Sequence, residues 1–270
     1  MYLKSEYQRF HHALSRTLIP CGILTVLLFV LFFSLLSGEQ TLSLSYWFAS
    51  LPQSFRSFYF ILANLDMSDP VVFFARFFQP VYFLLCLAAG IIGSRCLNAD
   101  ERGLGELWYT MPYSRTSVFL RRFLCGIAAL AAINILLLGI TLLCYTVLFI
   151  PNLTYVTIYA VIFLRMAVVE GVFYAIGVLY SACFHRPLHG SLLSAATLLF
   201  LWGIALIPAF SGHAEFLMYA ALPYYGIPEF ALQAGPFYSI GEGITLSSVF
   251  AAGTAAALLL YRRKQFYLFA

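Results

Sequence analysis

Two ionisable residues, Arg165 and Glu170, lie within a long apolar stretch of the sequence. A charged side chain inside a bilayer costs about 2.5–3.5 kcal/mol on insertion scales unless it faces protein or water. Both side chains are therefore expected to point into a helix bundle. Because the two positions lie about 140° apart around a helix axis, a direct pair within the helix is unfavourable. Each residue is expected to find its partner on another helix.

Two roles are open for this pair of residues. Arg165 and Glu170 either hold helices together or line a path through which a solute crosses the membrane. The second role is open because ionisable groups inside membranes are candidates for function. Asn134, in a neighbouring apolar stretch, is interpreted more simply as a residue that hydrogen-bonds between helices.

Motifs of nucleotide, metal and hydrolytic chemistry are absent from the sequence. No GxxxxGK[ST] stretch exists to cradle a nucleotide triphosphate, so the chain is not expected to hydrolyse ATP or to be an enzyme. His185 and His189 have the spacing of metal ligands, but Pro187 interrupts the helical turn and no acidic residue completes a metal site. No Gly-x-Ser-x-Gly stretch appears either. No cofactor or metal is expected in this chain.

The composition requires that these residues sit in a membrane protein. Of the 270 residues, 62% are hydrophobic and only 10% are charged, whereas a soluble domain has about 25% charged residues. Six apolar runs are long enough to cross a hydrocarbon core of about 30 Å, and only helices satisfy the backbone of such runs in lipid. An all-α, polytopic membrane protein forming a single domain, 1–270, is expected. The six predicted spans are Leu18 to Ser37, Val71 to Gly93, Phe123 to Ile150, Tyr155 to Cys183, Gly190 to Phe210 and Gly243 to Tyr261.

The distribution of cations predicts the orientation. Most Lys and Arg residues lie before the first span, between the second and third spans, between the fourth and fifth, and after the sixth. The positive-inside rule then places both termini in the cytoplasm of a multi-pass protein of the cell membrane. Nucleic acid is not an expected partner, because lipid orientation already explains these dispersed cations.

Two segments at the predicted inner face have helical features of their own. In residues 1–17, apolar residues recur at helical spacing among polar ones, which predicts an amphipathic elbow helix lying on the membrane surface. In the loop 94–122, glycines at 103 and 105 and Pro112 bound a stretch that predicts one short transverse helix, and Ser114 is expected to cap the next span. Such a helix could transmit force from a cytoplasmic partner to both attached spans.

This loop resembles the corresponding loop of the permease subunits of type 2 ABC exporters. Members of that family carry an acidic pair, a glycine, an acid-Leu step and a Leu-Pro-x-Ser-Arg turn after the second span. The residues that carry the resemblance are Glu101, Gly103, Glu106, Leu107, Met111, Pro112, Ser114 and Arg115. The N-terminal amphipathic segment, the six spans, the stretch ALPYYGIPEF and the ending YRRKQF are also similar to the family's architecture.

The resemblance implies a transport subunit that is driven by a separate ATPase subunit. Two permease subunits, identical or different, would pair in the membrane, and each would dock an ATPase that binds ATP and Mg. Residues 101–115 would form the coupling helix seated in that ATPase. The segment 211–242 would supply re-entrant external helices that form an outer gate. The aromatic, weakly charged interior favours an amphipathic or hydrophobic cargo, such as a peptide, a lipid-like molecule or a drug.

Two other functions remain open from the sequence. A secondary transporter or channel would use Arg165 and Glu170 to bind an ion and would move it without ATP. A non-transporting membrane subunit, for immunity or sensing, would move no solute even while its partner hydrolyses ATP.

Overall fold

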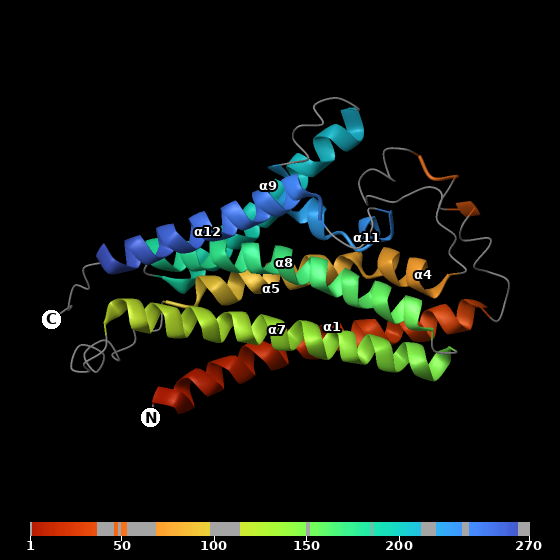
Figure 1. Ribbon diagram of the computed structural model, residues 1–270, viewed down its shortest axis with the longest axis horizontal. Coiled ribbons are helices and arrows are strands. Elements are labelled where there is room, and N and C mark those ends of the chain that lie inside the picture. Colours follow the sequence, from red (N-terminus) through yellow and green to blue (C-terminus); the bar gives the residue numbers. More distant parts are fainter. Residues whose placement is uncertain are drawn as a thin grey trace.

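The computed structural model describes the backbone of residues 2–36, 46–47, 50–52, 69–97, 114–149, 152–184, 186–211, 220–233 and 238–263. Within these ranges, the side chains of residues 2–14, 35–36, 208–211 and 233 are not described. The described residues form helices and no strands (Figure 1). In order they are α1 (Tyr2–Leu36), α4 (Pro70–Phe77), α5 (Gln79–Ser94), α7 (Arg115–Leu148), α8 (Leu153–Cys183), α9 (Pro187–Ser211), η2 (Leu222–Gly226), α11 (Phe230–Gln233) and α12 (Ile240–Arg263).

The helices confirm the prediction of an all-α, multi-pass membrane protein. Five of the described helices, α1, α7, α8, α9 and α12, are long and apolar enough to cross a membrane, and α4 with α5 makes a sixth span if the two are counted together. Each lies close to a run predicted from hydropathy. At about 1.5 Å per residue, α7 is about 51 Å long and extends beyond a hydrocarbon core of about 30 Å.

The second span is broken, which hydropathy did not predict. Helices α4 and α5 meet at Phe78 with a bend of 46°. Pro80 lies in the first turn of α5, where its missing N–H is tolerated but where its ring disfavours a continuous helix from α4. Asp69 caps α4 by accepting a hydrogen bond from the Val71 amide at 2.8 Å.

Helix α1 runs without a break from Tyr2 to Leu36. Residues 2–17, which belong to the predicted elbow helix 1–17, are therefore continuous with the first span. The position of these first turns relative to a membrane surface stays a prediction.

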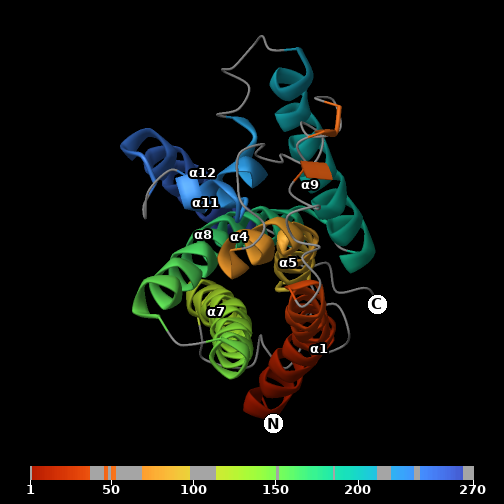
Figure 2. The same ribbon diagram turned by 90° about the vertical axis from the view of Figure 1, so that its right-hand side faces the viewer.

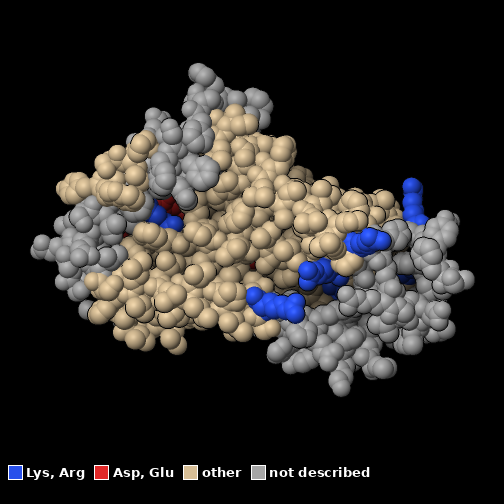
Figure 3. Space-filling model, turned by 180° about the vertical axis from the view of Figure 1, so that it is seen from behind, with Lys and Arg blue, Asp and Glu red and all other residues tan. Residues whose placement is uncertain are grey.

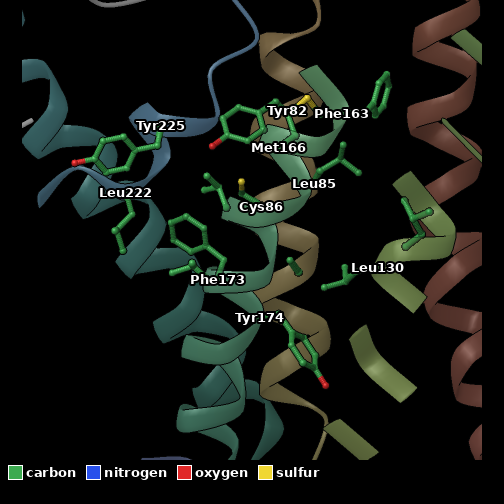
Figure 4. Packing of buried hydrophobic residues seen from close by; sticks show 14 of the residues in the cluster. Tyr82, Leu85, Cys86, Leu130, Phe163, Met166, Phe173, Tyr174, Leu222 and Tyr225 are labelled. Atoms are coloured by element: carbon green, nitrogen blue, oxygen red, sulfur yellow. The ribbon is translucent and has the colours of Figure 1, made fainter. Parts of the chain in front are cut away.

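Helix α8 is the centre of the bundle. It packs against α4, α5, α7, α9, α12 and the short elements η2 and α11, and Figure 2 shows the other long helices arranged around it. Its core residues include Phe163, Met166 and Phe173, which interleave with Tyr82 and Leu85 of α5 (Figure 4). Helix α8 therefore contacts most of the described elements of the protein.

Helices α5 and α8 approach each other through glycines. A Cβ atom added to Gly177 would lie 2.3 Å from the Gly90 carbonyl oxygen, and one added to Gly93 would lie 2.3 Å from the Tyr174 carbonyl oxygen. No side chain fits at these positions without separating the backbones. Small residues are the usual means of close helix packing in membranes, where dispersion contacts drive association.

Cationic residues gather at one end of the bundle, here called the basic end. This end holds the start of α7 and the end of α12 (Figure 1), and Figure 3 shows Lys and Arg side chains concentrated toward one end of a largely uncharged surface. Helix α1 begins at the same end (Figure 1). The basic end is defined by the exposed residues Arg95, Arg115, Arg121, Arg186, Arg262 and Arg263.

Most of the predicted coupling segment lies outside the described residues. This applies to Glu101, Gly103, Glu106, Leu107 and Pro112. In the sequence the segment connects α5 to α7.

The last two residues of the motif are described. Ser114 caps α7 as predicted, since its side chain accepts a hydrogen bond from the Ser117 amide at 3.3 Å. Arg115 begins the helix.

Candidate functional site

Glu170 is fully buried near the middle of α8 and bonds to the neighbouring helix α7. The Asn134 side-chain amide donates one hydrogen bond to Glu170 Oε2 at 2.7 Å and a second to the Leu130 carbonyl at 3.1 Å. This contact confirms that Asn134 hydrogen-bonds between helices and that Glu170 finds its partner on another helix. Two buried acceptors, Glu170 Oε1 and Asn134 Oδ1, have no hydrogen-bond partner in the part of the chain that the structure describes.

Arg165, also buried on α8, faces the segment that precedes α12. Its Nη2 atom donates to the Tyr225 carbonyl at 3.4 Å, and its guanidinium carbon lies 4.6 Å from the centre of the Tyr238 ring. The Tyr238 hydroxyl in turn donates to the Arg165 carbonyl at 2.6 Å. Burial raises the pKa of Tyr238 well above its usual range, against a lowering by the Arg165 guanidinium, so the phenol remains a neutral donor.

Arg165 and Glu170 thus form separate contacts, as predicted, and belong to two parts of one site. Glu170 joins α8 to α7, whereas Arg165 joins α8 to η2, in the segment that precedes α12. Both contacts hold helices together. Among the described residues, Glu170 is paired with a neutral amide and has no cation hydrogen-bonded to it.

A groove lies beside this polar cluster. It has a volume of about 440 Å³ and is walled by α7, α8 and α12. The size falls within the range of small-molecule sites, about 300–1,000 Å³. Asn134 lines the groove near the middle of α7, and Tyr238 lines it beside the start of α12. The remaining wall is largely apolar, formed by Ile127, Leu130, Ala131, Ala167, Val168, Gly171, Val172, Gly243, Leu246, Ser247 and Phe250.

A further buried cation, Arg76, lies within the second predicted span. Arg76 Nε donates to Glu229 Oε1 at 2.6 Å, Nη2 lies 2.5 Å from the same oxygen, and the two side chains are only 4% and 1% exposed. The sequence did hold a signal, since Arg76 interrupts a run long enough to span a membrane.

The described part of the predicted gate segment, 211–242, is packed into the bundle at the end opposite the basic end. Most of its residues from 221 to 229 are buried. Besides the Arg76–Glu229 pair, the Tyr82 hydroxyl donates to the Pro223 carbonyl at 2.7 Å. Figure 4 shows Tyr82 between α8 and the η2 residues Leu222 and Tyr225. Helices α4, α5 and α8 each make at least one polar contact with this segment.

The walls of the groove are also joined at the basic end. Arg115, at the start of α7, donates to the Arg262 carbonyl at 3.1 Å, and the Arg262 guanidinium donates to the Thr116 hydroxyl at 3.0 and 2.8 Å. Arg262 lies at the end of α12. The predicted coupling segment therefore leads directly into a contact between the two helices that flank the groove.

Metal ligands do not cluster in the described part of the chain, where no group of three or more His, Cys, Asp or Glu side chains is placed to hold an ion. A search against models of known protein families finds no match, and a search against curated proteins finds none either.

Proposed function

We propose that this chain is the membrane permease subunit of an ATP-driven ABC exporter. It would move an amphipathic or hydrophobic cargo across the membrane, and a separate ATPase subunit would bind ATP and Mg. Two permease subunits, identical or different, would form the complete path, with the basic end in the cytoplasm. The proposal rests on the resemblance of residues 101–115 to the coupling segment of that family, together with the architecture around it.

The structural observation that carries the proposal is the position of the segment that contains η2 and α11. A buried 3-10 turn and a short helix between the fifth and sixth spans are uncommon in a simple bundle, because irregular backbone at membrane depth must be covered by protein. Here η2 and α11 are packed against α8 at the end opposite the basic end. This is where an exporter of the type that the loop resembles would have its outer gate.

The contacts at the basic end support a route for force. A push on residues 101–113 acts on α7 directly, and through Arg115 and Arg262 it also acts on α12. Because α7 and α12 flank the groove while α8 holds its floor, a relative movement of the two walls would change the width of the groove. Coupling of this kind requires an element that has two arrangements, and we propose that α7 and α12 move between two arrangements against α8.

The test is recovery of the ATPase with the full chain. An affinity-tagged chain, purified in mild detergent from its own membrane, is expected to bring with it a cytoplasmic subunit that binds nucleotide. Glu106→Ala and Pro112→Ala are expected to reduce that recovery at least about tenfold. The matched control is Arg186→Gln. This variant also changes a cation at the basic end, but in the loop between α8 and α9 instead of the loop between α5 and α7. Equal recovery in all variants would remove the coupling role of the segment.

A second candidate function, an ion-coupled secondary transporter, is favoured by Glu170. A buried carboxylate without a bonded cation in mid-span is typical of proton and ion sites in such transporters. The two functions are separated by one measurement, since transport by the purified chain alone, driven by an ion gradient without ATP, would support the second function and contradict the first.

A further inference from the structure

Glu170 lies in an enclosed site at the contact between α7 and α8. Its side chain is 0% exposed, and it is not one of the residues that line the groove. The Asn134 amide donates to its Oε2 atom at 2.7 Å and is also bonded to the Leu130 carbonyl at 3.1 Å. Because the carboxyl group is enclosed in this way, a ligand that it binds while the helices are packed must be very small.

The groups around this carboxyl group supply no hydrogen-bonded positive charge. Three lie within electrostatic range of Glu170 on other helices, namely the thiol of Cys21 on α1 and, on α5, the thiol of Cys86 and the phenol of Tyr82. The partner on α7, Asn134, is a neutral amide. On the other elements packed against α8, no titratable side chain among the described residues is hydrogen-bonded to Glu170.

The buried guanidinium groups of the described residues lie in other contacts. Arg165, on the same helix, donates to the backbone of η2, and Arg76 of α4 is paired with Glu229. Arg122 lies about three turns from Asn134 on α7, which is about 18 Å along the helix axis. None of the three guanidinium groups is hydrogen-bonded to the enclosed carboxyl group.

An ionised carboxylate is unfavourable in such a site. Moving a charge out of water without an opposite charge beside it costs so much free energy that a buried acid takes up a proton instead. The Asn134 amide stabilises only Oε2, while Oε1 is buried and has no hydrogen-bond partner among the described residues. A proton on Oε1 removes the charge and also turns this atom from an acceptor into a donor.

We propose that Glu170 is a proton-binding residue, which holds a proton on Oε1 while α7 and α8 are packed together and releases it when the two helices separate. A proton fits an enclosed carboxyl group. A metal cation does not, because hard cations take about six or more oxygen ligands, and the described part of the chain places no group of three or more His, Cys, Asp or Glu side chains to hold an ion.

Proton binding and helix packing are coupled in this arrangement. The packed helices favour the neutral acid, whereas the carboxylate is favoured by the water that enters when Asn134 moves away from Glu170. A higher pH therefore favours the separated arrangement, and a lower pH favours the packed one. Because α7 directly follows the predicted coupling segment in the sequence, a force on that segment would act on the contact that holds the proton.

This inference goes beyond the proposed function, since proton binding needs neither ATP nor an ATPase. If Glu170 is protonated but no ATPase is recovered, the exporter proposal fails alone. If an ATPase is recovered but Glu170 is ionised in the packed bundle, the assignment of the proton site fails alone.

The test is infrared spectroscopy of the full chain in lipid nanodiscs at about pH 7, where carboxyl groups in water are ionised because their pKa is about 4. A C=O stretching band of a protonated carboxyl group is expected, separate from the bands of carboxylates and amides. Isotopically labelled glutamate is expected to shift this band, which assigns it to Glu instead of Asp. Absence of the band, or a band that the label does not shift, would overturn the proposal without any variant.

Variants assign the band to one residue. Glu170→Gln is expected to fold, because glutamine offers an acceptor and a donor as the neutral acid does, and to lose the band. Glu242→Gln is the matched control, because it makes the same change in a residue whose carboxylate accepts from the Ser239 amide at the start of α12, and it is expected to keep the band. A band that persists in Glu170→Gln would overturn the proposal.

The coupling to helix packing has its own readout. In an unfolding titration with SDS, the unmodified chain is expected to lose stability relative to Glu170→Gln as the pH rises above neutral, because only Glu170 can then lose its proton. A difference in stability between the two chains that does not change with pH would overturn the coupling.

Discussion

Removing one partner of the Arg76–Glu229 pair is expected to release the segment 220–233 from the bundle. The pair joins a residue of α4 to a residue of the turn after η2. The two side chains are only 4% and 1% exposed. Solvent therefore screens the interaction very little. Breaking a buried pair by removing one partner leaves an uncompensated buried charge and costs about 3–5 kcal/mol, which is roughly two to four orders of magnitude in the folding equilibrium.

The experiment is a double-mutant cycle with Arg76→Met, Glu229→Met and the double variant. Methionine keeps a long, unbranched side chain and removes the charge. Each single variant is expected to lose about 3–5 kcal/mol, whereas the double variant, which leaves no unpaired charge, is expected to lose much less than their sum. The free energy of unfolding is measured by titration with SDS in mixed micelles, and hydrogen exchange of residues 220–233 reports whether this segment is the part released.

Two results would refute this reasoning. One is a single variant that costs less than about 1 kcal/mol, because the pair would then behave like a solvated surface pair. The other is strict additivity in the cycle, since independent residues show no coupling energy.

Three further changes have expected outcomes. Gly177→Leu is expected to lower the stability of the bundle by about 1–3 kcal/mol or to prevent folding, because no Cβ fits against the α5 backbone; Gly139→Ala, which has open space around it, is the control in the same unfolding titration. Tyr82→Phe is expected to cost about 1–3 kcal/mol, because a buried carbonyl of the segment 220–233 loses its donor, and an unchanged unfolding midpoint would contradict this. Glu170→Gln is expected to lower transport in vesicles while assembly, followed by size-exclusion chromatography, stays intact; unchanged transport at normal expression would remove Glu170 from the path.

The sequence predicted the spans well because bilayer thickness and hydropathy constrain them strongly. It also predicted the Ser114 cap, which depends on a few neighbouring residues, and the use of Asn134 between helices. The break between α4 and α5 was not predicted, although Pro80 marks it. The reason is that a hydropathy window averages the hydropathy of many residues, so a single proline has little effect on the mean.

The pairing of the buried charges was beyond the sequence for a different reason. Arg76 and Glu229 are 153 positions apart, and their contact depends on how the segment 220–233 folds back on α4. Local spacing carries no information about such a contact. The groove was missed for the same reason, because its walls come from three helices that are brought together only by packing around α8.

The most direct test of the central claim is an assay of ATP hydrolysis on the full chain purified together with its bound partners. We expect Mg-dependent hydrolysis by a companion subunit, and loss of that activity from material purified with the Glu106→Ala chain. A purified assembly that moves solute, yet contains no subunit able to hydrolyse ATP, would contradict it.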